Sequence, residues 1–398
     1  MSASALNEDA TIAALIAYAS GTAERRAVEH TWALQLGGRV NWDRLATVLA
    51  QRRLLALLGP RLSPLAVDRS REDFATAVHQ ATEHGRRHGG FLQMVAELLR
   101  AKLTEAGIRS RQLKGPALGE LLYGDLGRRP ASDIDVLVEA DRLAEAVELA
   151  RTLSYEAPLD RTDRVGLPQL HFAMLHERRE LPPLELHWRV HWYERRFAAE
   201  RLLPPRGVAS ESWRANPADE LGSLLLFYAR DGFMNARHAV DIGAWWDLTG
   251  DRLPDAALDE LGRAYPPLRQ ALLAAAKVAE RTVGLPFEQL SHHGDRLSPR
   301  GRLAVRLASP RQIESEPQIY AEMGLIDGLL APRAELGSFI RRQILPPQEP
   351  ALAHRPLGRI RSVGTPLAHA VRSLARYALT LVRLLRPASS GAIAARPR

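Results

Sequence analysis

The stretch LKGPALGELLYGDLGRRPASDIDVLV, residues 113–138, decides the fold. It opens on a Lys-Gly turn that leads directly into a helix, because Pro116 is well suited to the first helical position. It ends on SDIDVLV (132–138), where polar and apolar residues alternate as they do in a half-buried strand. Upstream, IRSRQL (108–113) has the composition of a short strand. The region therefore predicts a strand, a turn, a helix and a second strand in close succession.

The residues that follow continue this alternation of helix and strand. DRLAEAVELARTLSYE (141–156) has apolar residues at helical spacing, whereas HFAMLHE (171–177) and PLELHWRVHW (183–192) alternate like strands. Residues 106–200 are therefore expected to form a small mixed sheet together with helices, which makes an α/β core.

Helical periodicity dominates on both sides of this core. Residues 1–105 carry about five helical segments, and the helical period returns over residues 201–345 after a stretch rich in proline and glycine. Residues 346–398 have the composition of a linker, a basic amphipathic helix and a disordered tail. We expect an α+β fold in which N- and C-terminal helical domains flank a small mixed-sheet core.

Two carboxylates stand two residues apart at the start of the second strand. Successive side chains alternate between the faces of a strand, so Asp133 and Asp135 project together, with Cβ atoms about 6 to 7 Å apart. Glu185 projects in the same way from the polar face of LELHW. If the two strands are neighbours, the three carboxylates converge into a site for a hard cation such as phosphate-bound Mg²⁺.

Basic residues and a glycine lie close to these acids in the sequence. Glycine at a strand-to-helix turn lets backbone N–H groups approach a polyphosphate, so Gly115 and the adjacent Lys114 are candidate phosphate ligands. Arg128 and Arg129, just before the aspartates, offer guanidinium groups that hold phosphate oxygens in pairs. Lys114 is one of only three lysines among 54 basic residues, and lysine and arginine are not interchangeable where a compact ammonium is needed.

Together these motifs resemble the uncharacterised nucleotidyltransferase family of bacteria, a branch of the polymerase-β-like nucleotidyltransferase superfamily. Its members pair a Lys-Gly turn and an Arg-x-x-x-Asp-Ile-Asp strand with a later Glu-x-His-Trp strand, and the resemblance covers most of residues 35–250. It implies a polymerase-β-like core. The wider superfamily usually has Gly-Ser at the start of the helix, whereas Pro116 follows Gly115 here, which removes a hydroxyl and an N–H from the phosphate site.

The resemblance also implies roles for single residues. Asp133 and Asp135 would bind two Mg²⁺ ions, or Mn²⁺ in their place, and Glu185 would complete the triad. The residues expected at the phosphates of the NTP, or in the case of Arg129 at the aspartate strand, are Lys114, Gly115, Arg128 and Arg129.

The implied reaction transfers an NMP from an NTP to a hydroxyl or similar acceptor and releases pyrophosphate. A small molecule or a peptide natural product is the expected acceptor. Three alternatives stay open: a toxin-like nucleotidyltransferase that modifies tRNA, a phosphotransferase that donates the γ-phosphate, and a catalytically retired protein that binds a nucleotide or peptide.

Two histidines follow Glu185 at even spacing. His187 and His191 share its face if the strand continues that far. A structural or substrate-lining role is favoured over metal ligation for both, because Mg²⁺ prefers oxygen ligands.

Polar residues in the later helical sequence are candidates for contact with the substrate. Asp231, His238 and Asp241 would face the cleft between the sheet and these helices. The alternative for Asp241 is an ion pair with Arg237 at i, i+4, on a helix that buries two adjacent tryptophans.

The composition excludes several classes of protein. The net charge, 54 − 46 = +8, is a mild excess that suits a phosphate-rich ligand without requiring nucleic acid. The absence of cysteine excludes disulfides, thiolate zinc sites and cysteine nucleophiles. We expect a cytoplasmic protein without a membrane span, because no signal-peptide pattern and no run of 18 uncharged apolar residues occurs.

The last helical segment of the sequence is basic. Arg372, Arg376 and Arg383 predict a packing helix with a solvated face, and an acidic partner or a membrane surface is the alternative.

Overall fold

The computed structural model describes residues 6–66, 69–156, 170–208, 213–292, 297–308, 316–344 and 366–385. Five helices precede the sheet in this part of the chain: α1 (Glu8–Ser20), α2 (Ala23–Gly37), α3 (Trp42–Gln51), α4 (Leu55–Leu62) and α5 (Arg69–Glu105). This agrees with the five helical segments expected from the periodicity.

The sheet has five strands in the described residues, and both parallel and antiparallel pairs occur in it. The strands are β1 (Ser110–Gln112), β2 (Ile134–Val138), β3 (Tyr155–Glu156), β4 (His171–His176) and β5 (Leu184–His187). Their order is β1-β2-β5-β4-β3, with β2 and β5 parallel and the other neighbours antiparallel. A mixed sheet among helices confirms the predicted α+β class.

The remaining helices lie within and after the sheet region. They are α6 (Pro116–Tyr123), α7 (Leu143–Arg151), α8 (Pro217–Arg230), α9 (Ala236–Thr249), α10 (Ala257–Ala264), α11 (Arg269–Val283), α12 (Phe287–Leu290), α13 (Pro299–Leu307), α14 (Glu316–Leu330), α15 (Leu336–Ile344) and α16 (Pro366–Leu385). Shorter helical turns are η2 (Ser63–Leu65), η3 (Leu126–Arg128), η4 (Ala140–Arg142), η6 (Ala198–Leu202), η7 (Gly250–Arg252), η8 (Pro266–Leu268) and η10 (Arg333–Glu335).

The segment 141–156, predicted as one helix, divides into a helix and a strand. The chain reverses at Ser154, whose φ is +60°, and Tyr155 then begins the edge strand β3. Tyr155 is fully buried and its hydroxyl donates a hydrogen bond to the carbonyl of Pro182 at 2.8 Å. These tertiary contacts outweigh the helical spacing of the segment. The prediction of a helix is therefore wrong for residues 152–156.

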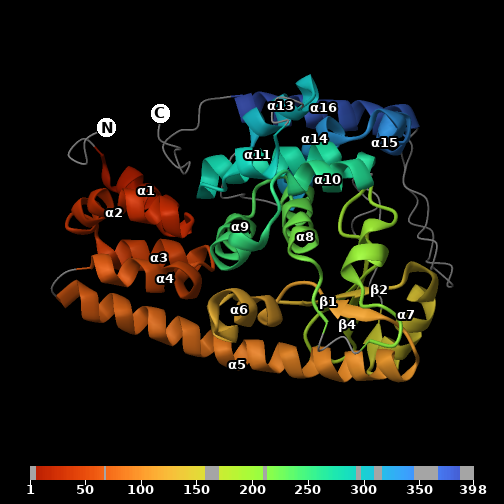
Figure 1. Cartoon of the computed structure of the whole chain (residues 1–398), viewed down its shortest axis with the longest axis horizontal. Helices are drawn as coiled ribbons and strands as arrows, with labels where there is room; N and C mark the ends of the chain where they lie inside the picture. Colours follow the sequence, from red (N-terminus) through yellow and green to blue (C-terminus); the bar gives the residue numbers. More distant parts are fainter. Residues whose placement is uncertain are drawn as a thin grey trace.

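One face of the sheet packs against α5 and α7. Ile134, Val136 and Val138 point to this side, as their alternation with the aspartates predicts, and all three are buried. They share a hydrophobic cluster with residues from β5, α5 and α7, namely Leu184, Leu186, Leu92, Leu99, Leu103, Ala146 and Val147. Figure 1 shows α5 running along this side of the sheet.

The other face of the sheet carries the polar side chains and is covered by later helices. Leu137 of β2 packs into the largest hydrophobic cluster of the described residues, which includes Leu225 and Phe227 of α8 and Ile242 of α9. The carboxylates of the sheet therefore lie at an interior boundary between sheet and helices, where charge interactions are stronger than in bulk water.

A single long helix contributes to two hydrophobic clusters. In its first half, Phe74 and Val78 of α5 pack with α3 and α4. In its second half, Leu92 and Leu99 pack against the sheet. Figure 1 shows α5 extending past both groups of elements.

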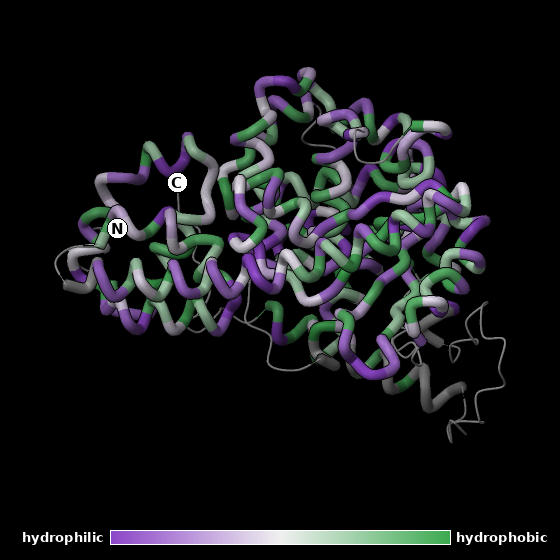
Figure 2. The backbone as a smooth tube through the Cα atoms, turned by 90° about the horizontal axis from the view of Figure 1, so that it is seen from below, coloured by the Kyte–Doolittle hydropathy of each residue, from purple (hydrophilic) through white to green (hydrophobic). Residues whose placement is uncertain are grey.

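The C-terminal helix α16 packs on α14 and α15. Arg383 is exposed, as expected, while the side chains of Arg372 and Arg376, the linker at 345–358 and the tail lie outside the described residues. Large apolar residues of α16 are exposed as well: Val371, Leu374, Leu379, Val382 and Leu385. Hydrophilic and hydrophobic residues alternate along most helices (Figure 2), and none of the described helices is long and apolar enough to cross a membrane.

Candidate active site

The three predicted carboxylates converge on the covered face of the sheet. The parallel register of β2 and β5 sets Asp135 opposite Glu185, and Asp133 lies just before β2. One oxygen from each of the three side chains lies within 4.8 Å of the others. This geometry follows from the alternation of both strands once β2 and β5 are neighbours. Three carboxylate oxygens at this spacing are a donor set that suits Mg²⁺ or Mn²⁺.

Two cationic groups contact the most buried of these acids. Asp135 is 3% exposed, and its Oδ1 lies 2.9 Å from Lys114 Nζ and 2.9 Å from His187 Nε2. Lys114 also lies over the ring of Phe227, 4.7 Å from its centroid. The ammonium of Lys114 is thus enclosed by the carboxylate on one side and an aromatic face on the other.

The pKa values of the cluster follow from burial and from these contacts. Burial and repulsion from Asp135 raise the pKa of Asp133. Although burial opposes its ionisation, Lys114 and His187 hold the pKa of Asp135 well below its usual range. Burial opposes the charged form of His187, but the carboxylates of Asp135 and Glu185, which accept hydrogen bonds from its Nε2, outweigh burial and raise its pKa. The site therefore favours the ionised form of Asp135 and disfavours that of Asp133.

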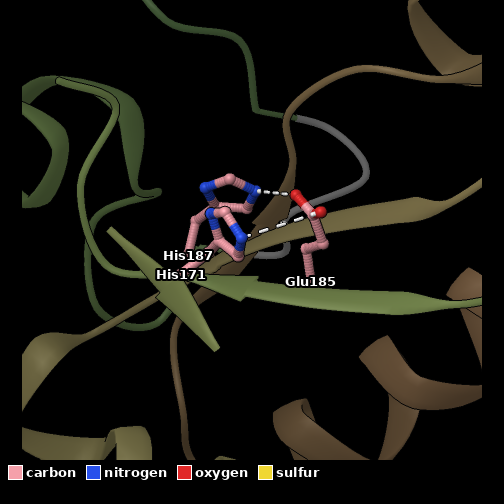
Figure 3. A group of neighbouring side chains, drawn as sticks. All are labelled: His171, Glu185 and His187. Atoms are coloured by element: carbon pink, nitrogen blue, oxygen red, sulfur yellow. Dashed lines mark hydrogen bonds and ion pairs between the residues drawn. The ribbon is translucent and has the colours of Figure 1, made fainter. Parts of the chain in front are cut away.

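A second histidine, from the neighbouring strand, also contacts Glu185. His171 begins β4 and lies opposite His187 in the antiparallel register of β4 and β5. Its Nε2 is 3.7 Å from Oε1 of Glu185, while Nε2 of His187 is 3.2 Å from Oε2. Figure 3 shows both imidazoles turned toward the one carboxylate. His187 thus lines up with the acids, as its even spacing from Glu185 predicts.

The turn before α6 brings backbone close to the acids. Gly115 is the N-cap residue of α6 with φ +77°, a conformation that L side chains rarely adopt, and Pro116 occupies the first helical position. Gly115 and Lys114 both line the cavity described below. The positive end of α6 therefore faces the carboxylates with one N–H fewer than a helix without proline would offer.

Arg129 and Asp241 form a buried ion pair beneath the site. Arg129 Nε lies 2.9 Å from Asp241 Oδ2, and the hydroxyl of Tyr123 donates to Oδ1 at 2.8 Å. The predicted pair between Arg237 and Asp241 is therefore wrong, because Asp241 is used by these two partners and Arg237 donates to the carbonyl of Pro130 at 2.6 Å. The adjacent tryptophans, Trp245 and Trp246, do pack in the core as expected.

Arg128 turns away from the carboxylates. Its guanidinium donates to the carbonyl of Leu57 in α4 at 3.4 Å and lies 5.5 Å from the ring centroid of Tyr123. Arg128 does not line the cavity that holds the acids. His191 is also apart from them, because β5 ends at His187 and His191 is buried beside Tyr193.

The helices opposite the sheet contribute a second set of charges. Arg230, at the end of α8, donates from Nε to Asp231 Oδ1 at 2.9 Å and stacks over Phe227. Although burial opposes its ionisation, Arg230 lowers the pKa of Asp231 to about 2. His238 Nδ1 lies 3.4 Å from Asp231 Oδ2, and burial lowers the pKa of His238 to about 3, so this imidazole is neutral.

The three carboxylates and many of the groups around them border one cavity of about 750 Å³ between the sheet and the helices. Its acidic lining is Asp133, Asp135, Glu185 and Asp231, and its basic lining is Arg52, Arg53, Lys114, Arg129, Arg230 and Arg237. Aromatic and apolar residues complete the wall: Leu170, Trp192, Met234, Ile319, Tyr320 and Met323. His171, Asn235 and His238 also line it, whereas Asp241 lies below it. Such a volume is in the range of about 300–1,000 Å³ that is usual for ligand pockets.

Several lining residues were not identified from the sequence. His171 could have been found, since it lies on the face of its strand opposite Phe172 and Met174. Arg230 adjoins a predicted residue, but nothing in its spacing marks it. Arg52 and Arg53 come from the turn after α3 and are brought to the cavity only by the tertiary fold.

A family model described as an uncharacterised nucleotidyltransferase matches residues 38–307. The chain belongs to this nucleotidyltransferase family. No curated protein and no solved structure matches the chain in the same comparisons. Membership of a nucleotidyltransferase family implies that the substrate that donates the nucleotide is an NTP. The matched span includes the carboxylates and the cavity walls up to His238, whereas Ile319, Tyr320 and Met323 of α14 lie beyond it.

Proposed function

We infer that the protein transfers an NMP from an NTP to a hydroxyl acceptor, with a divalent cation, Mg²⁺ or Mn²⁺, held at the carboxylates. One observation carries this proposal: Asp133, Asp135 and Glu185 converge from two neighbouring strands beside Lys114, in a cavity with room for a nucleotide. In the transfer, the acceptor oxygen bonds to the α-phosphorus, the bond to the leaving pyrophosphate breaks, and the hydroxyl proton passes to a base or to solvent.

The three carboxylates would hold the cations. Divalent ions held there would supply positive charge for the oxygens at the α-phosphorus. The raised pKa of Asp133 supports this role, because a cation relieves the repulsion from Asp135 that disfavours its ionised form. The side chain of Glu185 is more exposed than that of Asp135, at 24% against 4%. Glu185 would therefore either ligate a cation on the acceptor side or accept the hydroxyl proton.

Lys114 and the N-terminus of α6 would receive the phosphates. A cation bound at Asp135 satisfies the carboxylate that Lys114 contacts, which releases the ammonium to bind the β- and γ-phosphates and the departing pyrophosphate. Gly115 places the backbone of the helix start next to this position. Arg129 would fix the segment just before the aspartates to Asp241 of α9, and Arg128 would support the contact of η3 with α4.

The acceptor would bind against the wall formed by α14. Trp192, Met234 and Tyr320 give this part of the cavity aromatic and apolar surfaces, and Asp231 and His238 add polar groups beside them. A small molecule or a peptide fits such a lining. The α14 part of the wall lies outside the family match, so it is where this chain would differ in acceptor from other members.

The test is transfer of label from an NTP into material of a cell lysate, with separate α- and γ-labelled substrates. We expect α-label to be transferred, and Asp135→Asn to abolish the transfer while the protein stays folded. Asp141→Asn, which alters an exposed carboxylate near the far end of β2, is the matched control and should be fully active. A mass shift of one NMP in the labelled product then identifies both the base and the acceptor.

Four results would contradict the proposal. Full activity of Asp135→Asn would remove the carboxylates from the reaction, and transfer of γ-label would make the protein a phosphotransferase. Absence of Mg²⁺-dependent turnover of any NTP would favour a retired binding protein. Label found in tRNA, with binding that falls steeply as salt rises, would replace the small acceptor with a nucleic acid.

A further inference from the structure

The side chains around Glu185 form a second donor set that contains nitrogen. A ring nitrogen of His171, a ring nitrogen of His187 and a carboxylate oxygen of Glu185 lie within 4.8 Å of one another. They come from two antiparallel neighbours, β4 and β5, whose register sets His171 opposite His187. The imidazole rings are 4.9 Å apart between centroids, and both face the same carboxylate (Figure 3).

This donor set differs chemically from the carboxylates of β2. Two imidazole nitrogens and one carboxylate are typical ligands of borderline first-row transition ions, and three protein ligands leave an open coordination position. Mg²⁺ prefers oxygen and keeps much of its water, so it gains little from imidazole. The set that contains His171 and His187 therefore favours transition ions over Mg²⁺, whereas the set of three carboxylates binds both classes of cation.

The set of His171, His187 and Glu185 lies at the edge of the cavity and shares Glu185 with the carboxylate cluster. His187 is fully buried, and Glu185 keeps 24% of its side chain exposed at the cavity. One oxygen of Glu185 is turned to each histidine, at 3.7 Å for Oε1 and 3.2 Å for Oε2. A cation between the histidines would thus border the cavity beside Glu185 and His171, and it would replace the contact of His187 Nε2 with Asp135 Oδ1, which are 2.9 Å apart.

We propose that Glu185 is shared by two unlike cation positions, of which the one formed with His171 and His187 selects a divalent transition ion such as Mn²⁺, Co²⁺ or Zn²⁺. The other, formed with Asp133 and Asp135, is the hard-cation position. Any role of the transition ion in the transfer reaction rests on the proposed function, in which this ion would be the cation on the acceptor side. Binding of the ion itself does not depend on that reaction.

Co²⁺ is the probe, since its visible absorption reports nitrogen ligands and low coordination number. The titration uses the full chain in excess Mg²⁺ and a background of His84→Ala and His88→Ala, because these exposed histidines at i, i+4 on α5 could bind Co²⁺ by themselves. One equivalent of Co²⁺ should bind with ligand-field bands. Absence of such bands in this background overturns the proposal.

Two variants distinguish the two positions. His171→Ala should weaken Co²⁺ binding by more than roughly 10- to 100-fold, the loss usual for an outer-sphere partner alone, while Asp133→Asn should leave the bands in place. His176→Ala, at the other end of β4, is the matched control and should bind Co²⁺ normally. Normal Co²⁺ binding by His171→Ala, or equal loss in Asp133→Asn, contradicts the proposal. Thermal unfolding of each variant checks that the fold is intact.

The reaction itself is scored separately. Failure of label transfer with normal Co²⁺ binding would reject the proposed function and keep the metal position. Label transfer with Mg²⁺ and no Co²⁺ binding would do the opposite.

Discussion

At the scale of single residues, the site is neutralised by its own side chains. Asp135 is held between Lys114 Nζ and His187 Nε2, each at 2.9 Å, and both contacts favour its ionised form. The protein therefore supplies two partners of its own to the most buried carboxylate of the cluster. A cation that binds at Asp135 must replace these two partners. The affinity of the site for the cation is therefore the difference between the free energy of the cation–carboxylate contact and that of the contacts with Lys114 and His187.

Lys114→Arg is expected to weaken NTP binding about tenfold, the equivalent of one charged hydrogen bond. The ammonium is enclosed between Asp135 and the ring of Phe227, and a planar guanidinium is too large for that position. Calorimetric titration with a non-hydrolysable NTP measures the effect. Lys102→Arg, on α5, is the control. Near-normal affinity in Lys114→Arg would show that the lysine is an accident of the arginine-rich composition.

Glu194→Gln is expected to stabilise the protein at high pH. Burial raises the pKa of Glu194 from 4.5 to about 7, so its favourable protonated state is fully populated below 4.5 and lost as the pH rises through about 7. This loss amounts to about 3 kcal/mol, and glutamine avoids it. Glutamine also keeps the acceptor for the backbone N–H of Ala198, now at 2.8 Å.

Urea unfolding of the Glu194→Gln variant and the parent chain, at pH values from about 4.5 to above 7, measures this difference. The gap in the free energy of unfolding should widen as the pH rises to about 7 and then stay constant. A gap that is constant with pH would show that Glu194 ionises normally in the folded protein.

At the scale of elements, the alternation within each strand was predictable but the contacts between strands were not. The faces of β2 and β5 follow from the sequence, because apolar and acidic residues alternate in both. That Asp135 lies opposite Glu185 depends on which strands are neighbours, and this is decided by the tertiary fold. His171 could have been placed on the polar face of β4 from its alternation, but only the β4–β5 register brings it to Glu185.

The ion pair of Arg129 and Asp241 is a second contact between elements that the sequence did not predict. Sequence spacing favoured a local pair with Arg237 at i, i+4, whereas the actual partner is 112 residues away. Local spacing carries information about a single helix only. The preference for Arg129 comes from burial, because Asp241 is 0% exposed and needs partners that are buried with it.

Asp241→Asn should lower the free energy of unfolding by about 3–5 kcal/mol, because it leaves the buried guanidinium of Arg129 without a counter-ion. The double variant Arg129→Met with Asp241→Leu should recover most of that loss. Urea unfolding measures both. Asp247→Asn, which alters a more exposed pair with Arg26 on the same helix, is the control and should cost less than about 1 kcal/mol. A small loss in Asp241→Asn would mean that the pair contributes little to stability.

At the scale of the whole molecule, the sequence predicted the order of helical and mixed regions and the position of the cleft. The cavity does lie between the sheet and the helices after residue 217. Two contributions to its wall were not predicted, Arg52 from the turn after α3 and Tyr320 from α14. Both lie in regions that the sequence predicted as helical, residues 1–105 and 201–345, and nothing in their local pattern indicates that they approach the acids.

The single helix α5 has a consequence for how the chain can be dissected. It is 37 residues long, about 55 Å at the rise of an α-helix, and its second half supplies Leu92, Leu99 and Leu103 to the cluster beneath the sheet. A fragment that begins at residue 106 would keep every described strand but expose the apolar backs of β2 and β5. Such a fragment would aggregate, and the smallest piece able to fold around the carboxylates has to include the second half of α5.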